Sequence, residues 1–384
     1  MTRATKPLVV LGATGSIGTQ TLEVADGLGF DIAVLAARSP SRSLADLGRR
    51  YPDAEVIVAG GSSEEREDFS RSLGREALFG SDAILDAAAV RGRVVINGIV
   101  GAAGLRATVA ALEAGNRVAL ANKESLVAGG PVVVAALSEH GGDLLPVDSE
   151  HSALHQCLAG EAMDSVSRII LTASGGPFRG RSRESLADVT PEEALRHPTW
   201  DMGRRVTIDS ATMFNKGLEI VEAHYFFGVD YDRIAVLVHP QSILHSAVEF
   251  VDGSWKGHLG HPDMRIPIQY ALTAPRRLHA PGEPFTLAGM DLSFEEPDAH
   301  AFPAIEIAYE AGRAGGSAPA VMNAADEMAV EAFLQGRLGF LGISDVVART
   351  IQEVDWRELR TVDEVVEVDS EARSAAAGLI AGVC

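Results

Sequence analysis

The segment that decides the fold is Leu8-Val9-Val10-Leu11-Gly12-Ala13-Thr14-Gly15-Ser16-Ile17-Gly18, close to the start of the chain. Its four consecutive apolar residues predict a buried strand, and the glycines at every third position predict a tight turn into a helix that ends at about Leu28. Glycine lets the backbone approach a pyrophosphate, and the amino end of a helix offers N–H groups and a positive dipole. Taken alone, the segment is equally compatible with an ordinary glycine-rich connection.

Short apolar runs alternate with helical patterns up to residue 147, and this context favours the nucleotide-binding interpretation. The alternation is typical of a doubly wound, Rossmann-like parallel sheet, so we expect an N-terminal nucleotide-binding domain over residues 1–147 of an α/β protein. The predicted strands are Leu8–Leu11, Ile32–Ala36, Val56–Val58, Val94–Ile96, Val118–Leu120 and Leu144–Val147.

The chain beyond residue 147 has a different texture. Residues 148–273 carry strand-like runs among loops rich in Gly, Pro, His and Ser, which predicts a central α+β domain with functional loops. Residues 274–300 contain several prolines and are predicted to be a linker. Residues 301–384 are Ala-rich with helical periodicity, which predicts a C-terminal helical domain. The strands expected in the central domain are Arg168–Thr172, Ile234–Val238 and Ala247–Val251.

Composition and charge restrict the class of partner. The chain has 384 residues, of which 46% are hydrophobic, enough for substantial cores, and its formal net charge is −20. Nucleic acids and anionic membranes both require a basic face, so neither is an expected partner. No apolar run approaches the roughly 18 residues of a membrane span. The two cysteines, Cys157 and Cys384, suggest no disulfide framework, and the polar start Met1–Pro7 suggests no signal peptide, so we expect a cytoplasmic protein.

The end of the second predicted strand indicates the type of nucleotide. NAD-specific folds place Asp or Glu there to bind the ribose 2′-hydroxyl. Here the segment is Ala36-Ala37-Arg38-Ser39, which has no carboxylate but offers a guanidinium and a hydroxyl to a 2′-phosphate. We therefore predict NADP(H). The alternative is that Arg38 is an ordinary surface arginine.

Two carboxylates follow the last predicted strand of the sheet, in Pro146-Val147-Asp148-Ser149-Glu150-His151. In an extended segment Asp148 and Glu150 point the same way, which suits a hard divalent cation such as Mg²⁺ or Mn²⁺. The same residues could begin a helix that ends at Leu158, with Asp148 or Ser149 as its cap and Glu150 complementing its dipole. This segment alone favours the capping interpretation.

The densest group of polar residues is Asp209-Ser210-Ala211-Thr212-Met213-Phe214-Asn215-Lys216-Gly217-Leu218-Glu219. Asp209-Ser210 predicts a helix start, and on that helix Asn215 and Lys216 would share a face with Glu219. A surface Lys–Glu pair is the bland explanation. Against it, Ser210, Asn215 and Lys216 are three donors suited to a phosphate.

Five further features are candidates for a functional role. Ser174-Gly175-Gly176 could present donors to an anion, although a plain turn is equally good. Trp200 and Met202 lie in the loop His197–Gly203, where such residues suggest a lid over a ligand. The His-rich turns at His239–His245 and Gly260–Met264 rank lower, because a lone His is more often structural. Lys123 follows the fifth predicted strand and could orient a substrate or be solvated.

Together these motifs resemble, in order along nearly the whole chain, those of the 1-deoxy-D-xylulose 5-phosphate reductoisomerase family. The block from Asp209 to Glu219 is very specific, whereas the glycine loop by itself is not. The matching segments are Gly12–Gly18, Ala121–Ser125, Val147–His151, Ser174–Phe178, His197–Gly203, Asp209–Glu219, His239–His245 and Asn323–Glu327.

The resemblance implies a homodimeric, NADP-dependent oxidoreductase with isomerase chemistry, acting in non-mevalonate isoprenoid biosynthesis. A skeletal rearrangement of 1-deoxy-D-xylulose 5-phosphate with a divalent metal (Mg²⁺, Mn²⁺ or Co²⁺) would precede hydride reduction by NADPH to 2-C-methyl-D-erythritol 4-phosphate. Two alternatives are another NADP-dependent sugar-phosphate dehydrogenase and a non-enzymatic NADP sensor.

The resemblance also implies roles for individual residues. The metal ligands would be Asp148, Glu150 and Glu219, which with Lys123 and His197 are the implied catalytic residues. The implied NADPH contacts are Thr14, Gly15, Ser16, Ile17, Ala37, Arg38, Ser39, Gly98, Ile99, Val100, Asn122 and Glu124. The implied substrate contacts are Ser149, Ser174, His197, Trp200, Met202, Ser210, Asn215, Lys216, His245 and Met264.

Overall fold

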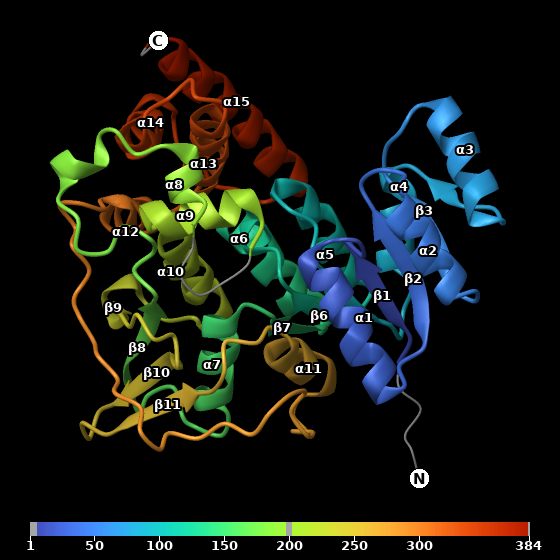
Figure 1. The fold of residues 1–384 in the computed structure, drawn as a ribbon, viewed down its shortest axis with the longest axis horizontal. Coiled ribbons are helices and arrows are strands. Elements are labelled where there is room, and N and C mark those ends of the chain that lie inside the picture. The colour runs from blue at the N-terminus through green and yellow to red at the C-terminus, as the bar shows by residue number, and fades with distance from the viewer. Residues whose placement is uncertain (1–5, 197–201, 383–384) are drawn as a thin grey trace. The chain divides into compact units, whose positions relative to one another are not determined.

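The computed structural model describes residues 6–196 and 202–382 (Figure 1). The chain divides into two compact units, each made of several separate segments. The first unit comprises Met1–Ser125, Val133–Asp148 and Asp263–Pro284, and the second comprises Leu126–Val132, Ser149–Pro262 and Phe285–Cys384.

A seven-stranded sheet forms the core of the first unit, in the order β4-β3-β2-β1-β5-β6-β7. Every pair of neighbours is parallel. Strand β1 and the first three residues of β5 are continuous runs of buried apolar residues, as expected where helices cover both faces of a sheet. The strands are β1 (Leu8–Leu11), β2 (Ile32–Ala37), β3 (Glu55–Val58), β4 (Leu78–Phe79), β5 (Val94–Asn97), β6 (Arg117–Leu120) and β7 (Asp143–Pro146).

The strand order reverses at β1, which has β2 on one side and β5 on the other. At such a switch point the loops leave in opposite directions and open a crevice beyond the carboxyl ends of the strands. The glycine loop follows β1 at this crevice. The predicted doubly wound sheet is therefore confirmed, and so are its six predicted strands, with β7 ending at Pro146. The two-residue β4 was missed because it is too short to give a periodic signal.

Helices connect these strands, and local sequence sets their ends. Helix α1 ends at Leu28 and is capped by Gly29, whose φ of 69° is the left-handed conformation typical of such a cap. Helix α3 begins with a capping box between Ser62 and Glu65. The helices of this part of the chain are α1 (Ser16–Leu28), α2 (Arg42–Arg50), α3 (Ser63–Leu73), α4 (Ser81–Ala88), α5 (Leu105–Glu113), α6 (Lys123–His140) and α11 (Arg265–Thr273).

The second unit contains a four-stranded mixed sheet in the order β11-β10-β8-β9. Strands β8 and β9 are parallel, and the other two pairs are antiparallel. The three predicted strands are confirmed. The edge strand β11 was missed because its sequence, Trp255-Lys256-Gly257-His258-Leu259, is largely polar and only partly buried. The strands are β8 (Val166–Ala173), β9 (Ile234–Val238), β10 (Leu244–Phe250) and β11 (Trp255–Leu259).

The predicted helical C-terminal region is confirmed, with four helices among its described residues, 301–382. Helix α13 is Ala-rich and buried over most of its length, so α14 and α15 pack closely against it. Helix α10 packs against α12 through Gly217, where an added Cβ would lie 2.9 Å from Ala308 Cβ. The helices of this unit are α7 (Ser149–Leu158), α8 (Pro191–Ala194), α9 (Arg204–Thr212), α10 (Phe214–Phe227), α12 (Ala304–Ala314), α13 (Ala318–Leu334), α14 (Phe340–Glu353) and α15 (Val362–Ala381).

The predicted helix start at Asp209-Ser210 is wrong. Helix α9 already begins at Arg204, and a break at Met213, with φ of 69°, separates it from α10. Asp209 is 2% exposed inside α9, where its carboxylate lies 3.5 Å from Arg205 Nε one turn earlier. Its residue type suggested a cap, but a buried ion pair fixes it in the helix interior instead.

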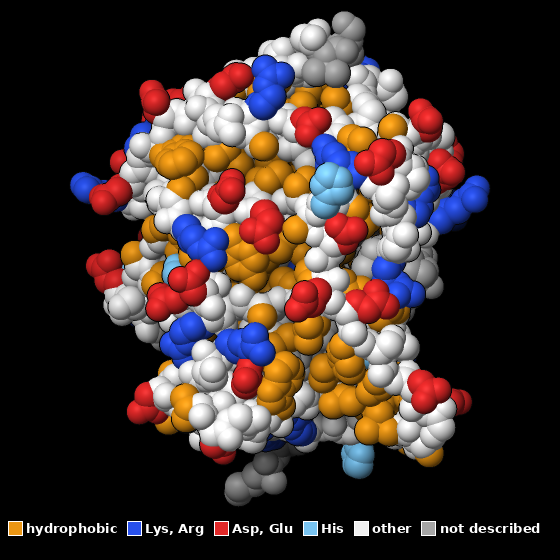
Figure 2. Space-filling model, turned by 90° about the vertical axis from the view of Figure 1, so that its left-hand side faces the viewer, with side chains coloured by type: hydrophobic (Ala, Val, Ile, Leu, Met, Phe, Trp, Pro, Cys, Tyr) orange, Lys and Arg blue, Asp and Glu red, His pale blue; other side chains and the backbone are white. Residues whose placement is uncertain are grey.

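No helix within residues 6–196 and 202–382 is long and apolar enough to cross a membrane. On the face shown in Figure 2, acidic and basic side chains are interspersed, and the described residues form no continuous basic area there.

Candidate active site

The glycine loop owes its shape to two close backbone approaches. A Cβ at Gly12, whose φ is 86°, would lie 2.6 Å from Gly98 O, and a Cβ at Gly18 would lie 2.3 Å from Gly12 O. Gly15 is exposed and stands at the amino end of α1, before Ser16. The loop therefore packs against its neighbours through Gly12 and Gly18 and leaves the helix amino end open, as a pyrophosphate requires.

The carboxyl end of β2 lies beside this loop. The backbone N–H groups of Gly12 and Ala13 both donate to Ala36 O, at 2.9 and 2.8 Å. Arg38 and Ser39 follow directly and are exposed. The residues predicted to bind the pyrophosphate and those predicted to bind the 2′-phosphate therefore lie at the ends of adjacent strands, as in dinucleotide-binding folds.

Two predicted cofactor residues hold the loop that follows β5. Asn122 Nδ2 donates to Ile99 O at 2.6 Å and to Gly101 O at 2.9 Å, and Glu124 Oε1 accepts from Gly101 N at 3.1 Å. Asn122 is also the N-cap of α6. Both side chains are buried, so the structure gives Asn122 and Glu124 the role of positioning the Gly98–Gly101 loop. Val100 in that loop is 71% exposed and available to a ligand.

Lys123 is not a solvated lysine. Its ammonium group donates to the Asp148 carboxylate just after β7, and the two side chains are only 13% and 12% exposed. A nearly buried ion pair of this kind fixes both side chains, because separating them would leave a charge without compensation. Lys123 and Asp148 thus form a defined group at the carboxyl edge of the sheet in the first unit.

In the second unit, a buried lysine joins two carboxylates from different helices. Lys216 Nζ donates to Glu150 Oε1 on α7 at 3.2 Å and also to the Glu219 carboxylate on α10. Asn215 Nδ2 donates to Glu219 Oε1 at 2.6 Å. Lys216 is 3% exposed and Glu219 is fully buried, so the surface Lys–Glu explanation is wrong. We call Glu150, Asn215, Lys216 and Glu219 the carboxylate cluster.

The segment around Glu150 is helical rather than extended. Helix α7 runs from Ser149 to Leu158, so the extended geometry expected for Asp148 and Glu150 is wrong, and Asp148 directly precedes the helix. The Ser149 hydroxyl donates to the Glu150 carboxylate. The predicted helix that ends at Leu158 is confirmed. The contact with Lys216 shows that Glu150 has a role besides complementing the dipole of this helix.

His151 supports the carboxylate cluster and was missed as a functional residue. It is fully buried, its Nε2 lies 3.0 Å from Glu219 O, and its Nδ1 lies 3.5 Å from Glu222 Oε2. Because partners engage both ring nitrogens, His151 ties α7 to α10 and thereby positions Glu150 and Glu219. Its place beside Glu150 in the sequence was a usable signal, but nothing in the sequence reveals Glu222 as its partner.

The residue types of the predicted metal ligands suit a hard divalent cation. Asp148, Glu150 and Glu219 offer carboxylate oxygens, the ligands that Mg²⁺ and Mn²⁺ prefer. Each of these carboxylates bonds to a lysine ammonium.

The predicted phosphate ligands come from three adjoining elements. The Ser174–Gly176 loop follows β8, and a Cβ at Gly176, whose φ is 66°, would lie 2.7 Å from Ser210 O at the end of α9. Met213 then joins α9 to α10, which begins just before Asn215 and Lys216. The structure therefore brings the Ser174 loop against Ser210, while the side chains of Asn215 and Lys216 bond to carboxylates.

The remaining predicted substrate residues are less closely joined. His245 is buried at 7% exposure, and burial, the largest cause, lowers its pKa, although nearby Glu150 opposes this. Met202 is half-buried ahead of α9, and Met264 belongs to the first unit ahead of α11. His197 and Trp200 lie outside the described residues, so the predicted lid stays a prediction.

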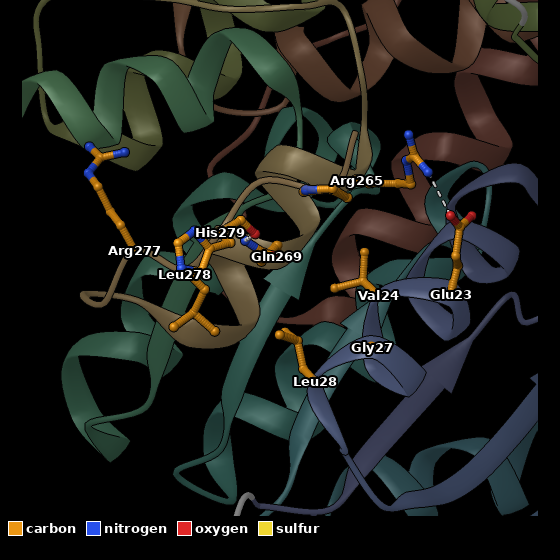
Figure 3. A pocket seen from close by; sticks show the side chains of 10 residues that line it. Glu23, Val24, Gly27, Leu28, Arg265, Gln269, Arg277, Leu278 and His279 are labelled. Atoms are coloured by element: carbon orange, nitrogen blue, oxygen red, sulfur yellow. Dashed lines mark hydrogen bonds and ion pairs between the residues drawn. The ribbon is translucent and has the colours of Figure 1, made fainter. Parts of the chain in front are cut away.

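A cavity of about 720 Å³ lies between α1 and α11 in the first unit (Figure 3). Its lining contains none of the predicted site residues. Its charged groups have partners already: Arg265 Nη1 lies 2.6 Å from Glu23 Oε1, and the Arg277 guanidinium lies 5.4 Å from the centre of the Tyr270 ring. The size would suit a ligand, but the chemistry-bearing residues lie elsewhere.

Comparison with known proteins identifies the family to which the chain is similar. A 1-deoxy-D-xylulose 5-phosphate reductoisomerase family model matches residues 8–130, and models of the family's C-terminal domains match residues 144–227 and 259–375. The reductoisomerase of Chloroherpeton thalassium is 47% identical over 96% of both chains, and that of Desulforamulus reducens is 46% identical over 98% of this chain and 99% of its own.

Solved structures agree. The reductoisomerase from Zymomonas mobilis in complex with NADPH has a TM-score of 0.91 and 42% identity, covering 98% of this chain and 99% of the other. A DOX-P reductoisomerase in complex with NADPH, fosmidomycin and magnesium has a TM-score of 0.90 and 35% identity, covering 98% of both chains. Family models, full-length relatives and fold lead to one conclusion: this chain belongs to the 1-deoxy-D-xylulose 5-phosphate reductoisomerase family.

Proposed function

We propose that this chain converts 1-deoxy-D-xylulose 5-phosphate into 2-C-methyl-D-erythritol 4-phosphate with NADPH and a divalent cation. The observation that carries the proposal is the buried carboxylate cluster, in which Lys216 joins Glu150 and Glu219. Burying two carboxylates and an ammonium is costly and adds little to stability, so a functional reason is needed. An NADP sensor has no use for such a cluster, and neither it nor a simple dehydrogenase explains the full-length relatives.

The first unit would bind NADPH through the groups predicted from the sequence. The backbone of Thr14, Gly15, Ser16 and Ile17 at the amino end of α1 is suited to the pyrophosphate, and Arg38 and Ser39 beside Ala37 are suited to the 2′-phosphate. Gly98, Ile99 and Val100 would face the nicotinamide half, on the loop that Asn122 and Glu124 hold.

Asp148, Glu150 and Glu219 would hold the divalent cation, for which Mg²⁺, Mn²⁺ and Co²⁺ are the candidates. When bound, it supplies Lewis acidity to the substrate's ketone and hydroxyl oxygens. The chain's own groups orient these carboxylates: Lys123 holds Asp148, and Lys216 with Asn215 holds Glu219. His151 and Glu222 fix the helices that carry Glu150 and Glu219.

The substrate phosphate would be bound by Ser174, Ser210, Asn215 and Lys216. The substrate body would contact Ser149, Lys123 and His197, with Trp200 and Met202 as a lid and His245 and Met264 completing the pocket. A lowered pKa keeps His245 neutral at neutral pH, so it would add no charge to a pocket that must bind a metal-chelating sugar. Phosphate binding energy can then drive closure and exclude water.

We also infer a cytoplasmic homodimer without nucleic-acid or membrane partners. The net charge of −20 supports the exclusion of both polyanionic partners. Sedimentation velocity at several concentrations would measure the oligomeric state.

The direct test supplies the purified chain with 1-deoxy-D-xylulose 5-phosphate, NADPH and Mg²⁺, then follows NADPH oxidation and determines the product's carbon skeleton by NMR. We expect a branched product and loss of turnover with a chelator. A reduced product with an unbranched skeleton would indicate a simple dehydrogenase, and NADPH binding without turnover would indicate a sensor.

A further inference from the structure

The turn between β9 and β10 passes the carboxyl end of β8. In the four-stranded sheet, β8 lies between these two strands, parallel to β9 and antiparallel to β10, so the connecting residues 239–243 cross its end (Figure 1). The backbone N–H of His239 donates to Ala173 O at 2.6 Å, directly before Ser174. The turn therefore begins beside the loop proposed for the substrate phosphate, and it leads into the strand that carries His245.

The His239 side chain joins this turn to a distant segment. Its Nε2 accepts from the backbone N–H of Ile243 at 3.1 Å, and its Nδ1 lies 2.9 Å from Ser293 O. The imidazole is fully buried and stacks on the Phe294 ring, with 4.6 Å between the ring centres. One side chain thus connects the end of the turn to a segment 54 residues further along the chain.

That segment, residues 293–295 of the predicted linker, is fixed against the end of β9 by other contacts. Val238 and Glu295 form an antiparallel bridge, with N–H···O distances of 2.8 and 2.9 Å. Gln241 Nε2 donates to Ser293 Oγ at 3.0 Å. The carbonyl of Ser293 is therefore already in place, and the bond from Nδ1 orients the imidazole of His239.

The two contacts determine the protonation of the His239 ring. The Ser293 carbonyl oxygen can only accept, so Nδ1 carries the proton, and the Ile243 N–H can only donate, so Nε2 carries none. A ring that meets both requirements is neutral. A charged ring, or the other tautomer, would point an N–H group at the N–H group of Ile243.

The turn has a backbone conformation that needs support. Ser242 has a φ of 51°, which is uncommon for a residue with a side chain. Its N–H donates to His239 O at 3.0 Å, which closes the turn. Residues in such conformations persist where their surroundings hold them. The bond from Ile243 N–H to His239 Nε2 holds the residue that directly follows Ser242.

We propose that His239 is a positioning residue: its neutral imidazole holds the backbone of Ile243 and thereby places His245 and the start of the Ser174 loop for the substrate. The Thr172 hydroxyl, which lies 2.7 Å from His245 O, would transmit a displacement of the turn to that loop. The inference rests on the proposed function for the identity of the substrate. His239 itself acts through the residues that it holds, since both of its ring nitrogens are engaged.

Two substitutions at His239 separate its two contacts. Asparagine can place an amide N–H near the position of Nδ1, and glutamine can place an amide oxygen near that of Nε2, so only His239→Gln keeps an acceptor for Ile243. We expect His239→Asn to raise the KM for 1-deoxy-D-xylulose 5-phosphate roughly three- to tenfold, the size of one lost hydrogen bond, with kcat little changed. The KM of His239→Gln should stay within about twofold of the unmodified value.

His300→Asn, the same change at an exposed histidine, is the matched control and should leave the substrate KM unaltered. The KM for NADPH should not change in any variant, because the residues proposed to bind the cofactor belong to the first unit. An equal rise of the substrate KM in His239→Asn and His239→Gln would overturn the proposal, because the contact with Ile243 would then not be the one that matters.

Nuclear magnetic resonance of the ring nitrogens tests the same contact without substrate. In the unmodified chain, isotopically labelled at histidine, the signal of His239 is identified by its loss in His239→Gln. We expect a neutral ring that is protonated at Nδ1. A proton on Nε2 would overturn the proposal, and this measurement does not require His239→Asn to fold.

The ring signals of His245 in the same spectra report on the turn itself. They should move in His239→Asn and stay in His239→Gln, because only the first substitution releases Ile243. His245 signals that stay in both variants would overturn the proposal. Signals that behave as expected, in a chain that does not turn over the substrate, would sustain the positioning role of His239 and reject the proposed function.

Discussion

The glycine loop of the first unit and the carboxylate cluster of the second are built from different parts of the chain. The loop is one continuous run, Gly12–Gly18, whose shape comes from backbone atoms packed within 2.6 Å of where a Cβ would stand. The cluster joins side chains 66 residues apart, with Glu150 on α7 and Lys216 on α10. We therefore expect Gly12 and Gly18 to accept no added side-chain atom, and the carboxylate cluster to accept no change of charge.

The largest effect we expect is that of Glu219→Gln, which keeps the shape of the side chain and removes its charge. Glutamine can still contact Asn215, but it cannot provide an anionic ligand or neutralise Lys216. The loss in kcat/KM should be roughly 1,000-fold, beyond the roughly 10- to 100-fold cost of losing an outer partner of a metal site. Steady-state NADPH oxidation as a function of Mg²⁺ measures it.

Glu310→Gln, the same change at an exposed position on α12, is the matched control and should leave kcat/KM unaltered. Circular dichroism would verify that both variants fold. Near-normal turnover by folded Glu219→Gln would show that the reaction does not depend on the charge of the carboxylate cluster.

The next effect is that of Gly18→Ala, which adds a single carbon to the loop and no charge. The new Cβ would meet Gly12 O at 2.3 Å and Ala13 Cα at 2.6 Å, so the loop or α1 must shift. Such overpacking costs about 1–3 kcal/mol. If it falls on cofactor binding, it corresponds to a roughly 10- to 100-fold increase in the Kd for NADPH, which fluorescence titration would measure.

Gly27→Ala lies in the same helix and is the control for glycine replacement itself. Nothing stands within 4 Å of a Cβ there, so the change should stabilise the chain by up to about 1 kcal/mol through helix propensity. Equal NADPH affinities in the two variants would show that the close approach at Gly18 does not shape the nucleotide site.

The same contrast explains what the sequence could predict. The parallel sheet and the glycine loop were predictable because apolar runs and glycine spacing are local signals, and Leu8–Leu11 with Ser16–Leu28 occupy the expected residues. Only one of the two partners of Lys216 was predictable. Helical periodicity places Glu219 on the same face as Lys216, but it gives no information about Glu150, which lies on another helix. Residue type also misled at Asp209, where a buried arginine partner decided the conformation and a capping preference did not.

Resemblance supplied what spacing could not. The resemblance implies Asp148, Glu150 and Glu219 as one set of metal ligands, whereas the local pattern around Asp148 and Glu150 favours a helix cap. It had no information on the supports: His151 bridging to Glu222, and Asn122 with Glu124 holding the Gly98–Gly101 loop, emerge only from three-dimensional contacts. Supports of this kind are single polar residues without a pattern, and only the fold brings them together.

The smallest effect, that of Arg38→Ala, tests whether the first unit also depends on a side chain. Arg38 is exposed just after β2, and losing one hydrogen-bonded charge there should weaken NADPH binding by about 1.5 kcal/mol, or roughly tenfold in KM. NADH lacks the 2′-phosphate, so its KM should not change, and the ratio of the two KM values isolates the contact. Arg42→Ala is the control, since Arg42 is also exposed and lies 4.0 Å from Asp46 one turn along α2. An equal rise in the KM values for NADPH and NADH would show that Arg38 shapes the loop but does not bind the 2′-phosphate. The nucleotide would then be bound by backbone groups alone.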